Sequence, residues 1–227
     1  VTRMKQEGAI NKVVVLINSA NALQVDFLQD ASYDIDACLW IGDVGISGIN
    51  AVAQILAGQV NPSGRLVDTY CYDNYSAPAM ANFTPIAYGG YTEGLIPAHA
   101  STYMIYQEGI YVGYKYYETR YEDYVMGTGN AGEYAYGQAV AFPFGYGLSY
   151  TDFAYSDMKV SYDASQDVYQ VQVTVTNTGS SYAGKETVQI YVQSPYTQYD
   201  QENGVEKASV ALCGFGKTDI LEPGASQ

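Results

Sequence analysis

The stretch that decides the fold is Phe142-Pro143-Phe144-Gly145-Tyr146-Gly147-Leu148-Ser149-Tyr150. Gly145 and Gly147 let the backbone turn where a side chain would clash, and Pro143 holds its own φ near one value. The four aromatic rings of this stretch offer a large apolar contact area. Because a segment this rigid and apolar is usually held between two packed bodies, we interpret it as an anchor between two domains.

The sequence before the anchor is typical of an α/β domain. Lys12–Ile17 is a continuous β-branched run and Ile35–Trp40 is a second apolar run. Such runs are typical of parallel strands that are covered on both faces. A glycine-rich loop follows the second run, and Asn50–Ala57 then has the apolar spacing of a helix. This pattern predicts part of an α/β domain over residues 1–150, with a parallel-rich sheet and flanking helices.

After the anchor the period of the pattern becomes two. Asp167–Asn177 alternates apolar and polar residues, Glu186–Gln193 does so again, and Lys207–Phe215 is a further strand candidate. These strands predict the start of a β-sandwich over residues 151–227. A complete sandwich needs about 100 residues, and only two convincing parallel strands precede the anchor. We therefore expect both domains to be parts of a longer protein.

The charge balance excludes several classes of partner. The chain has 24 acidic and 10 basic side chains, which gives a formal charge of −14 at pH 7. This charge repels phosphate backbones and anionic lipid, and no apolar run is long enough to span a bilayer. We expect neither nucleic-acid binding nor membrane insertion. Three cysteines without a CxxC pair predict no disulfide framework and no metal site, and no cofactor motif is present.

Several segments are interpreted as loops. Asn61-Pro62-Ser63-Gly64 has the composition of a turn, and residues 71–104 and 121–141 lack periodicity. Loops as long as residues 71–104 are usually functional or pack against another domain. This loop holds His99, the single histidine, which we interpret as a surface or hydrogen-bonded residue because no nucleophile pattern accompanies it.

The remaining chemistry consists of carboxylates in aromatic surroundings, because no Ser-His-Asp set, metal cluster or phosphate loop is present. Retaining glycoside hydrolysis needs two carboxyls about 5–5.5 Å apart. Asp43, Glu93, Glu108 and Glu118 lie in or beside loops, among 25 tyrosines whose flat faces and hydroxyls suit sugars or other domains. For each carboxylate, a solvated or structural role stays the alternative.

The loop after the second strand candidate is the predicted ligand-binding loop. Open α/β sheets place ligand loops after the carboxyl ends of strands. Here Trp40 offers a stacking face for a sugar ring, and Asp43 offers an acceptor for sugar hydroxyls. Glycines at positions 42, 45 and 48 let the loop approach a ligand closely. The alternative is that Trp40 is a core residue and that Asp43 caps a turn.

Four motifs together resemble glycoside hydrolase family 3: Lys12-Val-Val-Val-Leu16, Asn61-Pro-Ser-Gly-Arg-Leu66, Glu108-Gly-Ile-Tyr-Val-Gly-Tyr-Lys-Tyr-Tyr117 and Pro143-Phe-Gly-Tyr-Gly-Leu-Ser-Tyr150. They follow the order of the family's α/β sandwich domain and run into its fibronectin type III-like domain. The resemblance implies a sandwich domain truncated at its start and a fibronectin type III-like domain truncated at its end. It also implies a retaining exo-acting β-glycosidase, most commonly a β-glucosidase, with an oligosaccharide or β-glycoside substrate.

The resemblance also implies what the chain lacks. The family's nucleophile is an aspartate on a TIM-barrel domain, and its acid/base glutamate usually lies upstream of the strand at Val13–Ile17. No catalytic residue is therefore assigned here. Trp40–Gly48 departs from the family's Trp followed by Gly-Gln-Glu-Gly-Gly, and Ser47 stands near the place of that glutamate. The sequence around residues 18–23 and 107–120 resembles the bacterial branch of the family, in which the barrel follows these domains.

We accordingly expect the chain to be inactive alone, with the missing barrel of the same protein as its partner. A secreted or cell-surface bacterial location is expected rather than a cytoplasmic one. A function from another class stays open, namely a non-catalytic carbohydrate-binding or adhesion module, which the tyrosine content and the sandwich strands also fit.

Overall fold

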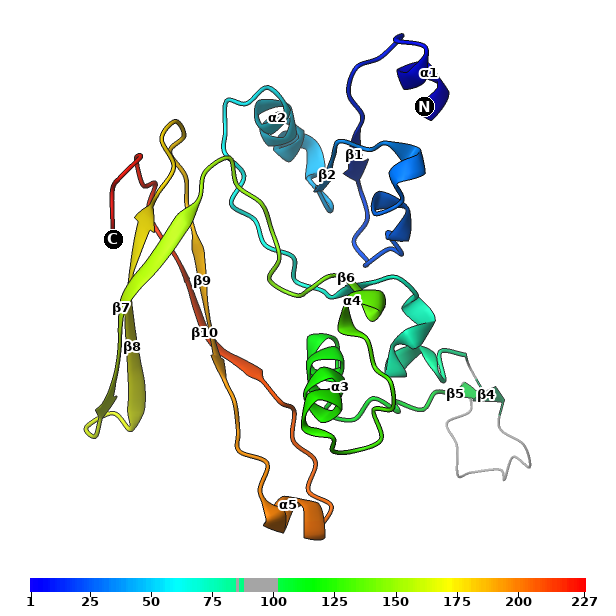
Figure 1. The fold of residues 1–227 in the computed structure, drawn as a ribbon, viewed down its shortest axis with the longest axis vertical. Helices are drawn as coiled ribbons and strands as arrows, with labels where there is room; N and C mark the ends of the chain where they lie inside the picture. The colour runs from blue at the N-terminus through cyan, green and yellow to red at the C-terminus, as the bar shows by residue number, and fades with distance from the viewer. Residues whose placement is uncertain (85, 88–101) are drawn as a thin grey trace. The chain divides into compact units, whose positions relative to one another are not determined.

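The computed structural model describes residues 1–84, 86–87 and 102–227 (Figure 1). The chain divides into two compact units, each built from three stretches. Unit 1 is Val1–Leu39, Asp68–Phe144 and Val192–Ala211, and unit 2 is Trp40–Val67, Gly145–Tyr191 and Leu212–Gln227. One of the passages from unit 1 to unit 2 lies inside the anchor, between Phe144 and Gly145. The predicted domain division at residue 150 stays a prediction. None of the described helices has the length and apolarity to cross a membrane.

Two short strands open unit 1. The first part of the chain forms α1 (Thr2–Gln6), β1 (Val14–Ile17), two 3-10 turns (Asp26–Leu28 and Ala31–Tyr33) and β2 (Ala37–Trp40). β1 pairs with β2, which confirms both predicted strands. The predicted coverage on both faces is wrong. Val14 and Leu16 are 44% and 41% exposed, because β2 is the one neighbour of β1 within the described residues.

The other strands also pair in twos. The described residues form five two-stranded sheets, and three of the pairs are antiparallel. The larger parallel-rich sheet predicted for residues 1–150 is therefore not assembled within the described part of the chain. The reason is that the later strands of this part are only two or three residues long: β3 (Tyr70–Cys71), β4 (Ile86–Ala87), β5 (Thr102–Tyr103) and β6 (Val140–Phe142). The result is a mixed α/β fold with small sheets and few helices.

The core of unit 1 lies where β3 and β6 meet α3 (Tyr114–Met126). The pairing of β3 with β6 sets Cys71 opposite Val140, and both pack against the buried ring of Tyr117. The Cys71 thiol donates to the Tyr117 hydroxyl at 2.8 Å. Burial raises the pKa of both groups. Cys71 is therefore a structural thiol rather than a reactive one.

Two helices occupy the ends of the loop predicted over residues 121–141, and the stretch between them, residues 127–135, is irregular as predicted. α3 extends to Met126 and ends at Gly127, whose φ of 66° is the left-handed conformation common after a helix. α4 spans Tyr136–Ala139. Sequence patterning misses α3 because charged residues stand between its tyrosines, so the apolar periodicity of the helix is weak. The predicted loop at residues 71–104 contains only 3-10 turns at Asn74–Ser76 and Pro78–Met80, besides β4 and β5, in its described part.

Unit 1 also includes α5 (Gln198–Glu202), which begins with a capping box formed by Thr197 and Asp200. Lys207 Nζ lies 2.7 Å from Asp200 Oδ2. The hydrogen bond from Lys207 lowers the pKa of Asp200 to about 2, so the capping carboxylate is charged at neutral pH.

One ring pair joins the two aromatic blocks of the sequence. The centroids of Tyr114 and Phe144 lie 4.6 Å apart with the rings tilted by 30°. This contact confirms that the block Tyr111–Tyr117 packs against the anchor within unit 1. Phe144 is partly buried rather than fully buried.

Replacing Phe144 by Ala is expected to lower the free energy of unfolding by about 2 kcal/mol. This is below the 3–5 kcal/mol typical of a fully buried ring, because part of the Phe144 ring stays in water. Urea unfolding measures the change. Phe215→Ala is the matched control, since the Phe215 ring is 77% exposed and its loss should change stability by less than about 0.5 kcal/mol. Equal stability of the two variants would contradict the anchor.

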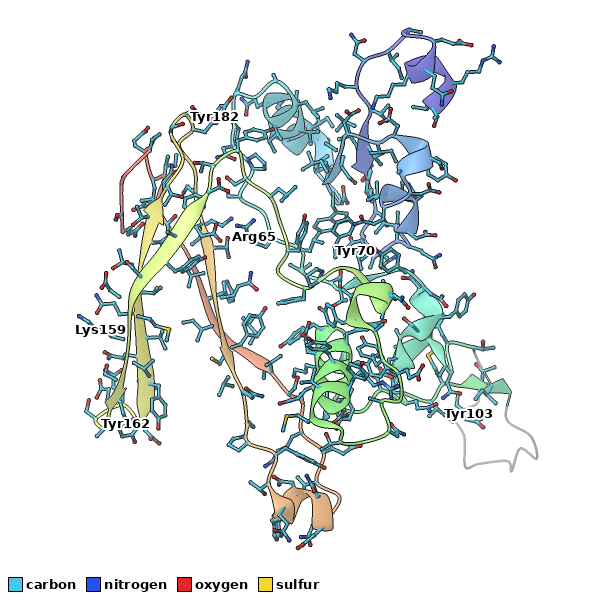
Figure 2. The ribbon with its side chains drawn as sticks, in the orientation of Figure 1. Arg65, Tyr70, Tyr103, Lys159, Tyr162 and Tyr182 are labelled. Atoms are coloured by element: carbon cyan, nitrogen blue, oxygen red, sulfur yellow. The ribbon has the colours of Figure 1, made fainter. Side chains whose placement is uncertain are left out.

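A long hairpin dominates unit 2. β7 (Phe153–Asp163) and β8 (Val168–Asn177) pair antiparallel. The register shifts between Ser156 and Lys159, where Asp157 has a φ of 55°, as expected for a β-bulge. Figure 2 shows Tyr162 close to the tip of this hairpin. β8 confirms the strand predicted at Asp167–Asn177.

The other elements of unit 2 are β9 (Thr187–Val192), β10 (Ala211–Lys217) and α2 (Gly45–Leu56). β9 and β10 form a two-stranded sheet and confirm the two later predicted strands. A complete fibronectin type III-like sandwich stays a prediction. The predicted helix is confirmed in α2, but it begins at Gly45, so the glycine loop is wrong from that residue onward. Gly48 lies inside this helix, and its N–H donates to the Val44 carbonyl at 3.1 Å.

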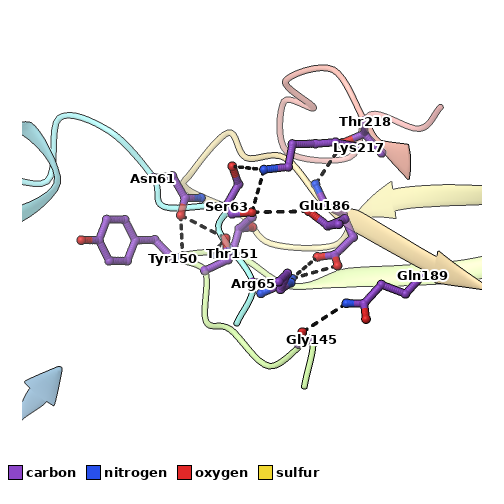
Figure 3. A network of polar contacts seen from close by, with 12 residues as sticks. Asn61, Ser63, Arg65, Gly145, Tyr150, Thr151, Glu186, Gln189, Lys217 and Thr218 are labelled. Carbon is purple, nitrogen blue, oxygen red and sulfur yellow. Dashed lines mark hydrogen bonds and ion pairs between the residues drawn. The ribbon is translucent and has the colours of Figure 1, made fainter. Parts of the chain in front are cut away.

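The segment Asn61–Arg65 connects distant parts of unit 2 (Figure 3). The predicted turn is wrong, because the segment is irregular and continues into Leu66, which runs beside the anchor. Leu66 N–H donates to the Tyr146 carbonyl, and Gly145 N–H donates to the Leu66 carbonyl, both at 2.8 Å. A Cβ on Gly147 would lie 2.5 Å from the Gly64 carbonyl oxygen, so only glycine fits there.

Side chains complete this connection. Asn61 Oδ1 accepts from Ser149 Oγ at 3.0 Å and from Tyr150 N–H at 2.9 Å. Lys217 Nζ donates to the Ser63 carbonyl at 3.0 Å. Arg65 Nη2 donates to both carboxylate oxygens of Glu186, at 2.8 and 2.7 Å. The conformation of the anchor in unit 2 thus depends on one short polar segment.

Candidate functional site

The predicted ligand-binding loop begins at Trp40, the last residue of β2. The indole is partly buried and lies against Gly42, where an added Cβ would come within 3.3 Å of Trp40 Cζ2. Gly42 also has a φ of 58°, so both the close contact and the backbone conformation require glycine. The Trp40 side chain therefore packs over its own loop and is not fully buried.

Asp43 lies on the same loop and is exposed. Its Oδ1 accepts from the N–H of Gly45, the first residue of α2, at 3.2 Å. A negative charge at this end of a helix is favourable. The structure thus brings Trp40 and Asp43 together on one loop and gives each a structural contact, and their contact with a ligand stays a prediction.

The other residues singled out in the sequence do not complete this site. Glu108 and Glu118 belong to unit 1, whereas Asp43 belongs to unit 2. Ser47 lies in the first turn of α2 and is exposed. Glu93 and His99 lie outside the described residues. Of the described carboxylates, neither Glu108 nor Glu118 therefore forms a catalytic pair with Asp43 within one unit.

A different concave site occurs in unit 1. A pocket of about 1110 Å³ opens between α3 and the segment that leads into α4. One face of α3 supplies its first wall, since residues three positions apart on a helix lie side by side. The charged and aromatic residues that line it are Glu118, Tyr121, Tyr124, Glu133, Tyr134 and Tyr136.

The two walls of the pocket are joined by a hydrogen bond. The Tyr136 hydroxyl donates to Glu118 Oε1 at 2.5 Å, and the Tyr121 ring meets the Tyr136 ring edge-on with centroids 5.5 Å apart. Burial, followed by the hydrogen bond to Glu118, raises the pKa of Tyr136. Tyr136 is therefore a neutral donor, and the carboxylate of Glu118 is held in one place.

Arg120 fixes the second wall from behind. Its guanidinium donates to the carbonyl of Ala131 at 3.0 Å and to Asn130 Oδ1 at 3.2 Å. It also lies 5.9 and 5.8 Å from the ring centroids of Tyr116 and Tyr134. Burial raises the pKa of Tyr134. These contacts hold the segment after α3 against the helix and preform the pocket.

Sequence reasoning identified only Glu118 of these six lining residues. The available signal was the occurrence of tyrosine at positions 114, 117, 121 and 124, whose spacing of three or four is helical. That signal was outweighed by the glycines at 127, 129 and 132, which favoured a loop.

Comparisons with known proteins identify the family to which the chain belongs. The family model described as the glycosyl hydrolase family 3 C-terminal domain matches residues 1–114. A β-glucosidase of Ruminococcus albus is 34% identical over 223 residues, which cover 98% of this chain and 19% of that protein. An exo-α-(1→6)-L-arabinopyranosidase of Bifidobacterium breve is 34% identical over 194 residues, covering 85% of this chain and 21% of that protein.

Solved structures agree with these relatives. A β-glucosidase from Paenibacillus barengoltzii superposes with a TM-score of 0.74 at 34% identity, over 100% of this chain and 20% of that one. β-Glucosidase 3B of Thermotoga neapolitana, in complex with glucose, superposes with a TM-score of 0.72 at 32% identity, over 100% of this chain and 26% of that one. The chain spans about a fifth to a quarter of the length of these relatives. With the family model matching half of it and the four sequence motifs in place, this chain belongs to glycoside hydrolase family 3 and matches that family's C-terminal domain.

Proposed function

We propose that this chain is part of a retaining exo-β-glycosidase that hydrolyses terminal, non-reducing β-linked sugars. The observation that carries the proposal is the alignment of 98% of the chain with a β-glucosidase at 34% identity. The substrate class is an oligosaccharide or β-glycoside, which agrees with a relative solved in complex with glucose.

We infer that the catalytic carboxylates lie outside this chain, the nucleophile on a TIM-barrel domain of the same protein. Two observations support this inference. The relatives are four to five times longer than the part they share with the chain. In addition, the two-stranded sheet of β1 and β2 leaves apolar side chains exposed, and such small sheets need further packing to be stable. The chain alone is therefore inactive, and a secreted or cell-surface bacterial location is part of the same proposal.

The test uses the longer gene product that carries this chain. It should release nitrophenol from an aryl β-glucoside or β-xyloside, and proton NMR should show the β-anomer as the first sugar product, because the mechanism retains configuration. An α-anomer as first product, or no hydrolysis of any β-glycoside by a folded protein, would overturn the proposal.

We propose further that Trp40 and Asp43 contact the substrate. In the longer protein, Asp43→Asn is expected to lower kcat/KM at least tenfold, about 1.4 kcal/mol, because an amide is a weaker acceptor for sugar hydroxyls than a carboxylate. Asparagine keeps an oxygen that can accept from Gly45 N–H, so the start of α2 is preserved. Steady-state kinetics measure the change. An unchanged kcat/KM would leave the loop with a structural role alone.

A further inference from the structure

The pocket of unit 1 has the chemistry of a sugar-binding site, and we propose that it binds a β-linked oligosaccharide. The choice of a β-linked sugar rests on the proposed function, whereas the inference that the pocket binds a sugar rests on the residues that line it. Neither Trp40 nor Asp43 takes part in it.

The aromatic part of the pocket is available to a ligand. Tyr121 and Tyr124 are 45% and 50% exposed, although they lie on the helix that carries the buried core residue Tyr117. Tyrosine combines an apolar ring with a polar hydroxyl, so such rings can cover the C–H face of a sugar while their hydroxyls bond its edge. Two exposed rings one turn apart on α3 offer more than one stacking position.

The polar part of the pocket consists of acceptors. Glu118 lines the pocket from α3, and Glu133 lines it from the segment that leads into α4. The Tyr136 hydroxyl already orients Glu118. Carboxylates accept strong hydrogen bonds from neutral donors, and a sugar supplies several hydroxyl donors on one ring. Gln138 adds an amide to the same lining.

Size favours a sugar over the other ligand class that tyrosines and carboxylates recognise, an organic cation. Aromatic cages bind quaternary ammonium groups best when the rings remove them from water. A pocket of about 1110 Å³ is slightly larger than the usual small-molecule site of roughly 300–1000 Å³, and it is too wide to remove one ammonium group from water. An extended neutral ligand of several sugar rings fills such a space.

The pocket is also preorganised. Arg120 ties the Asn130–Ala131 turn to α3, and the core of Cys71, Tyr117 and Val140 packs against Tyr134 and Tyr136. A ligand therefore meets walls that are already ordered, which lowers the entropy lost on binding.

Calorimetric titration of the 227-residue chain with cellotetraose tests the proposal. We expect a dissociation constant on the order of 0.1–1 mM, typical of an open site. Tyr124→Ala and Glu133→Gln should each weaken binding at least fivefold. Tyr75→Ala is the control, because Tyr75 is 78% exposed in the same unit but does not line the pocket. Since the ligand is neutral, the affinity should stay the same between about 50 and 500 mM salt.

Several outcomes would overturn the proposal. One is that cellotetraose binds neither to the 227-residue chain, shown by circular dichroism to be folded, nor to the longer protein. Another is equal affinity in Tyr124→Ala and in the control. Tighter, salt-sensitive binding of choline would assign the pocket to cations instead. If the longer protein hydrolyses β-glycosides but neither Tyr124→Ala nor Glu133→Gln alters cellotetraose binding, this inference fails and the proposed function stands. If the pocket binds the sugar but the longer protein hydrolyses no β-glycoside, the proposed function fails and this inference stands.

Discussion

The 227-residue chain on its own is expected to hydrolyse aryl β-glucosides at least about 10⁴-fold more slowly than the longer protein that carries it. The reason is that retaining hydrolysis needs a nucleophile and an acid/base at one sugar ring, and we infer that both lie outside the chain. Removal of one general acid or base already costs about 10²–10⁴-fold in rate, and groups that act as a unit lose more. The measurement is nitrophenol release at equal molar concentrations of the two proteins.

A complementation experiment is the control for this result. The rest of the longer protein, expressed separately and mixed with the chain, should regain activity if the two parts assemble, whereas neither part should be active alone. Enzymatic turnover by the isolated chain would mean that its own carboxylates perform the reaction. In that event Asp43, Glu108 and Glu118 would each be replaced by the corresponding amide to find them.

The parts of this protein that sequence reasoning predicted well are those with local patterns. The β-branched run of β1 and the alternation of β8 mark their strands directly, because the side-chain period is set within the segment itself. The four motifs identify the family for a similar reason, since each is a short and specific stretch. The exposure of β1 was mispredicted, because burial depends on what packs against a strand and not on the strand alone.

The parts that sequence reasoning missed depend on contacts between distant residues. Arg65 and Glu186 are separated by 121 positions, and no pattern in either neighbourhood points to the other. The pocket of unit 1 also depends on contacts between separate segments, since Tyr136 donates to Glu118 and Arg120 binds the turn between them at Ala131. The expectation that Gly45 and Gly48 lie in a loop also failed, because both belong to α2, where the Gly48 N–H donates to the Val44 carbonyl.

The Arg65–Glu186 pair is where such a distant contact should matter most for stability. The two side chains are only 15% and 9% exposed, so each charge has lost most of its water. Burial, together with the neighbouring Glu186, raises the pKa of Tyr155 to about 12, and Tyr155 therefore adds a neutral hydroxyl beside the carboxylate. Removal of Arg65 would leave Glu186 buried without its cation.

Arg65→Ala is accordingly expected to lower the free energy of unfolding by about 3–5 kcal/mol, the cost typical of breaking one side of a buried ion pair. Urea unfolding followed by tyrosine fluorescence measures it. Arg3→Ala is the matched control, because the Arg3–Glu7 pair is 86% and 56% exposed and such surface pairs contribute less than about 1 kcal/mol. The double variant Arg65→Met/Glu186→Leu separates charge from packing. It should lose much less stability than Arg65→Ala, because no unpaired charge stays buried. A double variant as unstable as the single one would show that the shape of the Asn61–Arg65 segment, rather than the ion pair, holds the anchor in place.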